Sequence, residues 1–132
     1  VMPNYNGVWS LSTQYQNATG WPQAPTFGFF AGGSLASSQG QIQQLIFATS
    51  GTTTDFGDLT VNVDDTPAGL ASKTRGIVGG GLASGNNISN VMQYITMATS
   101  GNTTDFGDRT VSSRSLGGLS NNVRGIMFGG DV

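Results

Sequence analysis

The sequence contains a long internal repeat, and this repeat constrains the fold more than any other feature. Residues 47–61 and 97–111 align at an offset of 50, with twelve identical positions among fifteen. A second signature, an apolar segment that ends in two glycines, occurs at residues 28–33, 76–81 and 125–130, with spacings of 48 and 49. Recurrence at this period indicates a repeat architecture, in which each unit packs on its neighbours.

Each unit is predicted to hold about four short β-strands. Apolar strands are expected before each double glycine, and further apolar or small-residue strands are expected at 42–48, 91–98, 68–72 and 117–120. Leu59, Val61 and Val63 alternate with polar residues, which predicts a half-buried strand. The Thr-Ser-Gly-x-Thr-Thr-Asp segment predicts a turn, because its side chains can bond nearby backbone groups. This strand count and period favour β-propeller blades.

The predicted organisation is an all-β repeat domain behind a short leader. The leader covers residues 1–26 and the repeat domain residues 27–132, divided into two full repeats and a started third at 27–74, 75–123 and 124–132. Two blades cannot close a propeller and would leave strand edges exposed. We therefore expect oligomerisation to complete the ring, most simply as a trimer. A non-propeller β-fold, such as a sandwich or prism, is the alternative geometry.

The leader is predicted to form a short helix over residues 11–18. Ser10 or Ser12 can cap its start, and Gly20 and Pro22 can end it. Two interpretations of its aromatic residues stay open: they dock the protein onto a neighbouring subunit, or they cover the end of this chain's own core. These residues are Trp9, Tyr15 and Trp21.

The repeated motif predicts architecture rather than catalysis. The chain has no histidine, cysteine or glutamate, so the usual general bases, thiol nucleophiles and zinc ligands are missing. We expect no enzyme activity, catalytic residue, metal or cofactor. The residues predicted to be structural are Asp55, Phe56, Gly57, Asp58, Arg75, Asp105, Phe106, Gly107, Asp108 and Arg124.

Two interpretations of the repeated aspartates were weighed. In the favoured one, Asp55 and Asp105 accept backbone N–H bonds in a turn, and Asp58 or Asp108 pairs with Arg75 or Arg124. In the other, the paired carboxylates bind calcium, since hard oxygen ligands suit that ion.

Low charge restricts the possible partners. Only 9% of the residues are charged and the net charge is −2, which cannot create the single-sign field that nucleic acid or an anionic membrane requires. No apolar run approaches the length of a membrane span, so no membrane insertion is expected. Nucleic acid is likewise not an expected partner.

The double glycines, with Tyr94 and Arg114 in the second unit, resemble kelch-type β-propeller repeats. A closer resemblance is to repeat proteins of tailed bacteriophages, marine and cyanobacterial phages above all. It rests on the segments at 48–60 and 98–110, on Thr74-Arg75-Gly76 and Gly79-Gly80-Gly81, and on a leader with Gly7-Val8-Trp9, Gln14-Tyr15-Gln16 and Trp21-Pro22. The resemblance covers nearly the whole chain and implies kelch-like blades in a virion structural protein.

The expected function is that of a non-enzymatic phage virion module, in a tail fibre, a tail tip or a capsid decoration. Its expected partners are copies of itself, other virion proteins and a host-surface glycan, and its expected location is the virion. Residues 34–41 and 82–90 differ between units and are the predicted contact loops. The alternative is a soluble oligomeric lectin, in which aromatic side chains stack on sugar rings.

Overall fold

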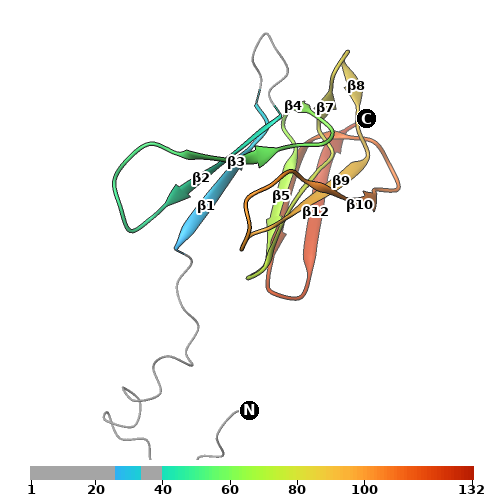
Figure 1. Ribbon diagram of the computed structural model, residues 1–132. Coiled ribbons are helices and arrows are strands. Elements are labelled where there is room, and N and C mark those ends of the chain that lie inside the picture. The colour runs from blue at the N-terminus through green and yellow to red at the C-terminus, as the bar shows by residue number, and fades with distance from the viewer. Residues whose placement is uncertain (1–25, 34–39) are drawn as a thin grey trace, which may run out of the picture.

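The computed structural model describes residues 26–33 and 40–132 (Figure 1). Throughout these ranges the regular structure is β-strand, which confirms the all-β prediction. The predicted helix at 11–18 lies outside the described residues, as do Trp9, Tyr15 and Trp21. Residues 34–39, most of one predicted contact loop, lie outside them too.

The described strands form four small antiparallel sheets. The first sheet has the order β1–β2–β3, and its strands are Phe27–Ala31, Gln41–Ile46 and Thr54–Asp58. The second has the order β10–β9–β6–β5, with strands Thr104–Asp108, Val91–Thr96, Arg75–Gly79 and Ala68–Ala71. The third pairs β11 with β12, Arg114–Ser120 and Gly125–Asp131. The fourth joins β4, β7 and β8, which are Val63–Asp65, Leu82–Ala83 and Asn87–Ile88.

The sheets are offset from the repeat units of the sequence. In the second sheet β5 of the first unit pairs with β6 of the second, Leu70 opposite Ile77. The pairing of β11 with β12 repeats this arrangement one unit later, with Leu119 opposite Ile126. A complete four-stranded sheet therefore takes one strand from one unit and three from the next. The expectation that each unit forms its own blade was wrong, because the last strand of a unit crosses to the following sheet.

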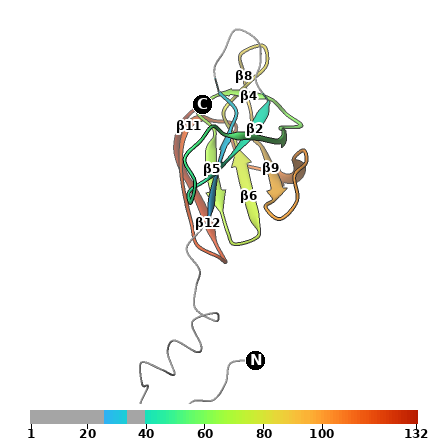
Figure 2. The same cartoon turned by 60° about the vertical axis from the view of Figure 1, so that its left-hand side comes forward.

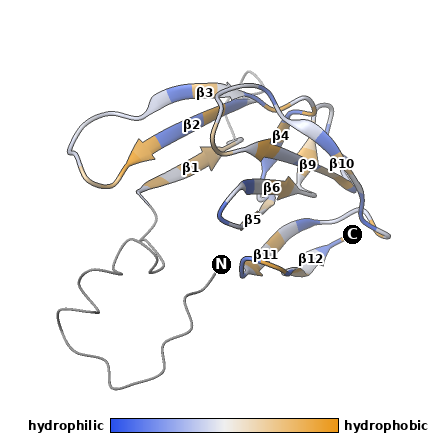
Figure 3. Ribbon diagram, turned by 60° about the horizontal axis from the view of Figure 1, so that its bottom comes forward, coloured by the Kyte–Doolittle hydropathy of each residue, from blue (hydrophilic) through white to orange (hydrophobic). Residues whose placement is uncertain are grey.

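The β1–β2–β3 sheet, the β5–β6–β9–β10 sheet and the β11–β12 pair are stacked, with the β5–β6–β9–β10 sheet in the middle (Figure 3). The described residues form no closed propeller, so a ring within the chain is not observed. The core lies between the first and second sheets. Its buried side chains are Ile42, Phe56, Leu59, Val63 and Ile95.

The first glycine of each double glycine has nearly the same φ angle in all three copies. Gly32, Gly80 and Gly129 have φ angles of 74°, 69° and 74°. This left-handed region is unfavourable for residues with a Cβ. The repeat is therefore a repeat of backbone geometry as well as of sequence.

Two local predictions need correction. Thr54–Asp58 and Thr104–Asp108 are strands, whereas their first residues were assigned to a turn. Residues 59–62 are not a strand, although Leu59 and Val63 are buried as their alternation predicted. The alternation correctly identified the inward side chains, but the backbone there is bonded by a side chain instead of a neighbouring strand.

Replacement of Gly80 by alanine is expected to destabilise the fold by about 2 kcal/mol or more. Its φ is +69°, and a Cβ there would meet the Ser113 carbonyl oxygen at 2.8 Å and the Leu116 side chain. The matched control is Gly69→Ala in β5, where a Cβ has open space. Urea unfolding should show a lower midpoint for Gly80→Ala only; equal midpoints would contradict the packing argument.

Candidate functional site

The Asp-Phe-Gly-Asp motif forms the same local structure in both units. The Gly57 amide donates to Oδ1 of Asp55 at 3.1 Å, and the Gly107 amide donates to Oδ1 of Asp105 at 2.9 Å. Opposite each motif the strand register shifts, so the phenylalanine is the extra residue of a bulge. The prediction that both aspartates accept backbone N–H bonds is confirmed, although they do so in a strand bulge.

In the first unit this bulge contacts the second unit directly. The Gly101 amide donates to the Phe56 carbonyl at 2.8 Å, and the Thr103 amide donates to the Asp58 carbonyl at 2.9 Å. A Cβ on Gly57 would run into the Gly101 carbonyl. Glycine at this position is therefore required for the close approach of two backbones.

A buried glutamine completes the contact. The Gln93 side chain is 2% exposed; its amide nitrogen donates to the Val61 carbonyl at 2.6 Å, and its oxygen accepts from the Val61 amide at 2.9 Å. The Thr103 hydroxyl donates to the same oxygen at 2.8 Å and accepts from the Thr60 amide. The side chain of Gln93 thus acts as a strand partner for Val61.

We call this set of contacts the inter-unit interface. The first unit contributes Phe56, Asp58, Thr60 and Val61, and the second contributes Gln93, Gly101, Asn102 and Thr103. Sequence analysis singled out Phe56, Gly57 and Asp58 but missed Gln93 and Thr103. A signal was present, since a glutamine recurs at offset 50 in equivalent strands, as Gln43 and Gln93.

The same motif is open in the second unit. Phe56 is 6% exposed, whereas Phe106 is 46% exposed and Val111 is 53% exposed. Among the described residues none takes the place beside Gly107 that Gly101 takes beside Gly57. Sequence identity therefore does not give the two motifs the same environment.

The predicted pairing of Asp58 or Asp108 with Arg75 or Arg124 is wrong. The Arg75 guanidinium lies over the Tyr94 ring, 4.8 Å from its centroid. Arg75 stands opposite Thr96 at one end of β9, while Asp108 stands opposite Val91 at the other end. The backbone amide of Arg124 donates to Oδ1 of Asn121 in the hairpin between β11 and β12.

Within residues 26–33 and 40–132, no three acidic, histidine or cysteine side chains gather where they could hold a metal ion. The calcium interpretation therefore gains no support from geometry. In the same ranges there is no helix of the length and hydrophobicity needed to cross a membrane.

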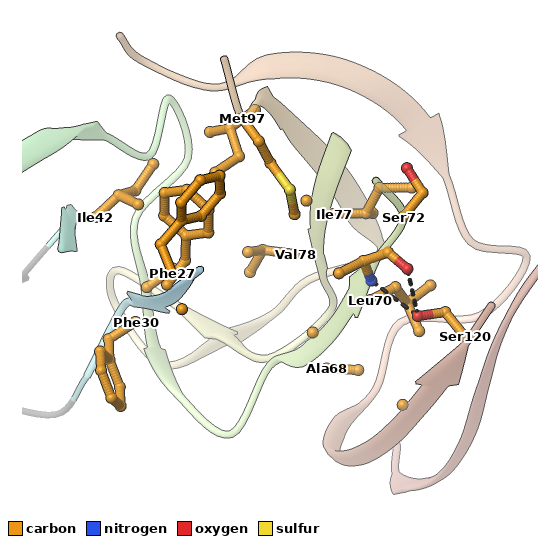
Figure 4. Close-up of a pocket in the computed structure, with 18 of the residues that line it drawn as sticks. Phe27, Phe30, Ile42, Ala68, Leu70, Ser72, Ile77, Val78, Met97 and Ser120 are labelled. Atoms are coloured by element: carbon orange, nitrogen blue, oxygen red, sulfur yellow. Dashed lines mark hydrogen bonds between the residues drawn. The ribbon is translucent and has the colours of Figure 1, made fainter. Parts of the chain in front are cut away.

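An apolar cleft of 1380 Å³ lies between β1 and the β5–β6 pair (Figure 4). Phe27 and Phe30 of β1 lie on one side, and Leu70 and Ile77 on the other. The strands equivalent to β1 are β6 and β12, and each has a neighbour at this place: β5 lies beside β6, and β11 lies beside β12. In the described sheet, β1 has no such neighbour. Figure 2 shows β5 and β6 running side by side.

No protein family and no curated protein matched the sequence.

Truncation of Phe56 to alanine is expected to destabilise the protein by about 3–5 kcal/mol. Phe56 is buried and its ring lies 4.8 Å from that of Phe29, edge to face. Phe106→Ala is the matched control, because the half-exposed ring buries less apolar area. Its cost should be less than half as large in chemical denaturation. Similar costs would show that the two motifs share one environment in solution.

Gln93→Ala is expected to cost about 2–4 kcal/mol, because it leaves two backbone groups of Val61 without partners and creates a cavity. Gln43→Ala removes the equivalent residue, which is exposed in β2, and should change the free energy of unfolding by less than about 1 kcal/mol. Both values follow from denaturation midpoints at equal m-values. A small effect of Gln93→Ala would contradict the role assigned to its side chain.

Proposed function

We propose that this protein is a non-enzymatic structural module of a bacteriophage virion, in a tail fibre, a tail tip or a capsid decoration. The observation that carries the proposal is the inter-unit interface, in which the most distinctive repeated motif serves to join one unit to the next. A motif used in this way supports an architectural role. The resemblance to phage repeat proteins supports the virion as its setting.

The chemistry of the interface fits a structural role. It consists of backbone amides and carbonyls, two carboxamides and two hydroxyls, arranged around glycines that permit close approach. Such contacts fix distance and register, and they provide no nucleophile beside a base. The side chains of Asp55 and Asp105, the first aspartate of each motif, are engaged in holding the bulge.

The contact surface that we propose is the β7–β8 hairpin, residues 82–88, which projects from one end of the stack (Figure 1). Its turn is held by Gly85 and Asn86, with φ angles of 79° and 62°. A short hairpin on a rigid sheet stack can present polar side chains to a host surface or to another virion protein. It lies within the loop 82–90 that differs between the two units.

If the proposal holds, the chain is a stoichiometric component of purified virions. Particles from a producing culture would be banded on a density gradient and analysed by mass spectrometry and immunogold labelling. We expect the chain to co-migrate with the particles and label one feature of them. Recovery only in the particle-free fraction would contradict the proposal. Saturable binding of that free protein to a glycan array would favour the lectin instead.

A further inference from the structure

The inter-unit interface has two halves, one from each unit, and because the sequence repeats, each half occurs twice in this chain. Within the described residues, only one copy of each half takes part in a contact between units. The face of β3 meets the second unit, while the equivalent face of β10 is open within the described residues. Conversely, the Gln93–Thr103 pair is buried, while its equivalent, Gln43 with Thr53, lies at the surface. The described residues thus present one unused half of each kind.

The unused halves retain the contact geometry of the used ones. The Thr53 hydroxyl donates to Oε1 of Gln43 at 2.7 Å, and that of Thr103 donates to Oε1 of Gln93 at 2.8 Å. Gly51 and Gly101 have φ angles of 157° and 156°. The exposed glutamine is therefore already held in the orientation that the buried one needs.

The open face of β10 is equally well preserved. Phe106, Asp108, Thr110 and Val111 repeat the four residues that the first unit contributes to the interface, without a substitution. On the opposite face one position differs, because Thr52 replaces Asn102. Asn102 accepts the Asp58 amide at 3.0 Å, and the shorter threonine hydroxyl would take that place.

We propose that a second copy of this chain docks on β10 and reproduces the inter-unit interface between molecules. Gln43 of one copy would bond both backbone groups of Val111 in the other, as Gln93 bonds those of Val61. The amides of Gly51 and Thr53 would donate to the carbonyls of Phe106 and Asp108. This inference concerns self-assembly and does not depend on a location in a virion.

Such an interface is heterologous, because a different surface of each copy takes part. Repetition of a heterologous contact produces a closed ring when the rotation between copies closes, and a filament when it does not. A trimeric ring, as expected from the sequence, is one closed form of this assembly.

The arrangement requires an exchange of strands. β1 and β12 are the equivalent strands of the first and third units, so β1 of the second copy would reach the place that β12 occupies in the first. β12 is the strand that leaves more easily: Ile126 and Phe128 are 56% and 52% exposed, whereas Phe29 of β1 packs on Phe56 in the core. The incoming β1 would then pair with β11.

The exchange also fills two clefts between the described strands. In the 1380 Å³ cleft, β11 of one copy would lie beside β1 of the other and against its β5, as β11 already packs against β5 within the chain. A second cleft of 530 Å³, lined by Ile77, Met92 and Phe106, would receive β2 of the incoming copy. One docking event would therefore cover the open strand edges and the apolar surfaces together.

The proposal is tested on the full chain by sedimentation velocity from low to high micromolar concentration. We expect wild type to form oligomers reversibly, and Gln43→Ala to need about a ten-fold higher concentration, because two hydrogen bonds of the interface are lost. Gln41→Ala is the matched control, an exposed glutamine of the same strand outside the interface. Val111→Lys, on the opposite face, should weaken assembly as Gln43→Ala does.

A wild type that stays monomeric throughout overturns the proposal, as does equal assembly by Gln43→Ala and Gln41→Ala. Circular dichroism of each variant as a monomer distinguishes lost assembly from lost folding. Failure of the virion experiment would leave these results unaffected, so the two proposals fail separately.

The strand exchange has a test of its own, in which a variant should strengthen assembly. Oδ1 of Asn121 accepts the amides of Val123 and Arg124 at 2.8 and 2.7 Å and so holds the β11–β12 hairpin. Asn121→Ala should release β12 and lower the concentration needed for assembly several-fold. Unchanged or weaker assembly by this variant would overturn the exchange of β12 for β1.

Discussion

The structure depends on providing hydrogen-bond partners for backbone that leaves a sheet and enters the core. After β3 the chain runs through residues 59–62, where Leu59 is buried and Val61 is half-buried, so its backbone groups need partners. Gln93 satisfies both groups of Val61, and Thr103 holds the amide of Gln93 in place. Because an unpartnered buried group costs about 1–3 kcal/mol, these two side chains determine how closely the first and second sheets can approach.

Sequence periodicity predicts where strands lie here better than which strands pair. The glycine signatures and the apolar segments correctly predicted β1, β2, β6, β9 and β12, because the backbone conformation at a double glycine is a local property. The assignment of β5 to its own unit failed for a physical reason. A small-residue strand such as Ala68–Ala71 has the same local pattern whether it pairs backward or forward along the chain. Pairing is decided by tertiary contact, which a period alone does not report.

In the candidate site too, contacts between residues close in the sequence were predicted, whereas contacts between distant residues were not. Asp55 and Asp105 were correctly predicted to bond backbone amides, since that interaction spans two residues. The predicted partners of Arg75 and Arg124 were wrong, because they required knowledge of which ends of β6 and β9 lie together. Identical motifs also differ in burial, as Phe56 and Phe106 do, because the burial of a residue depends on the neighbouring segment that covers it. No property of the motif itself could have revealed this difference.

An interface of this chemistry also explains why so few charges are needed. Backbone groups, two carboxamides and two hydroxyls supply its polar contacts, and Asp58 takes part through its backbone. Contacts between neutral groups are not screened by salt, whereas exposed ion pairs weaken as ionic strength rises. A chain with 9% charged residues can therefore hold its units together independently of ionic strength. The specificity that charge would otherwise provide has two other sources. One is glycine at positions where a Cβ would collide with the opposite backbone. The other is Gln93, whose side chain bonds both the amide and the carbonyl of Val61.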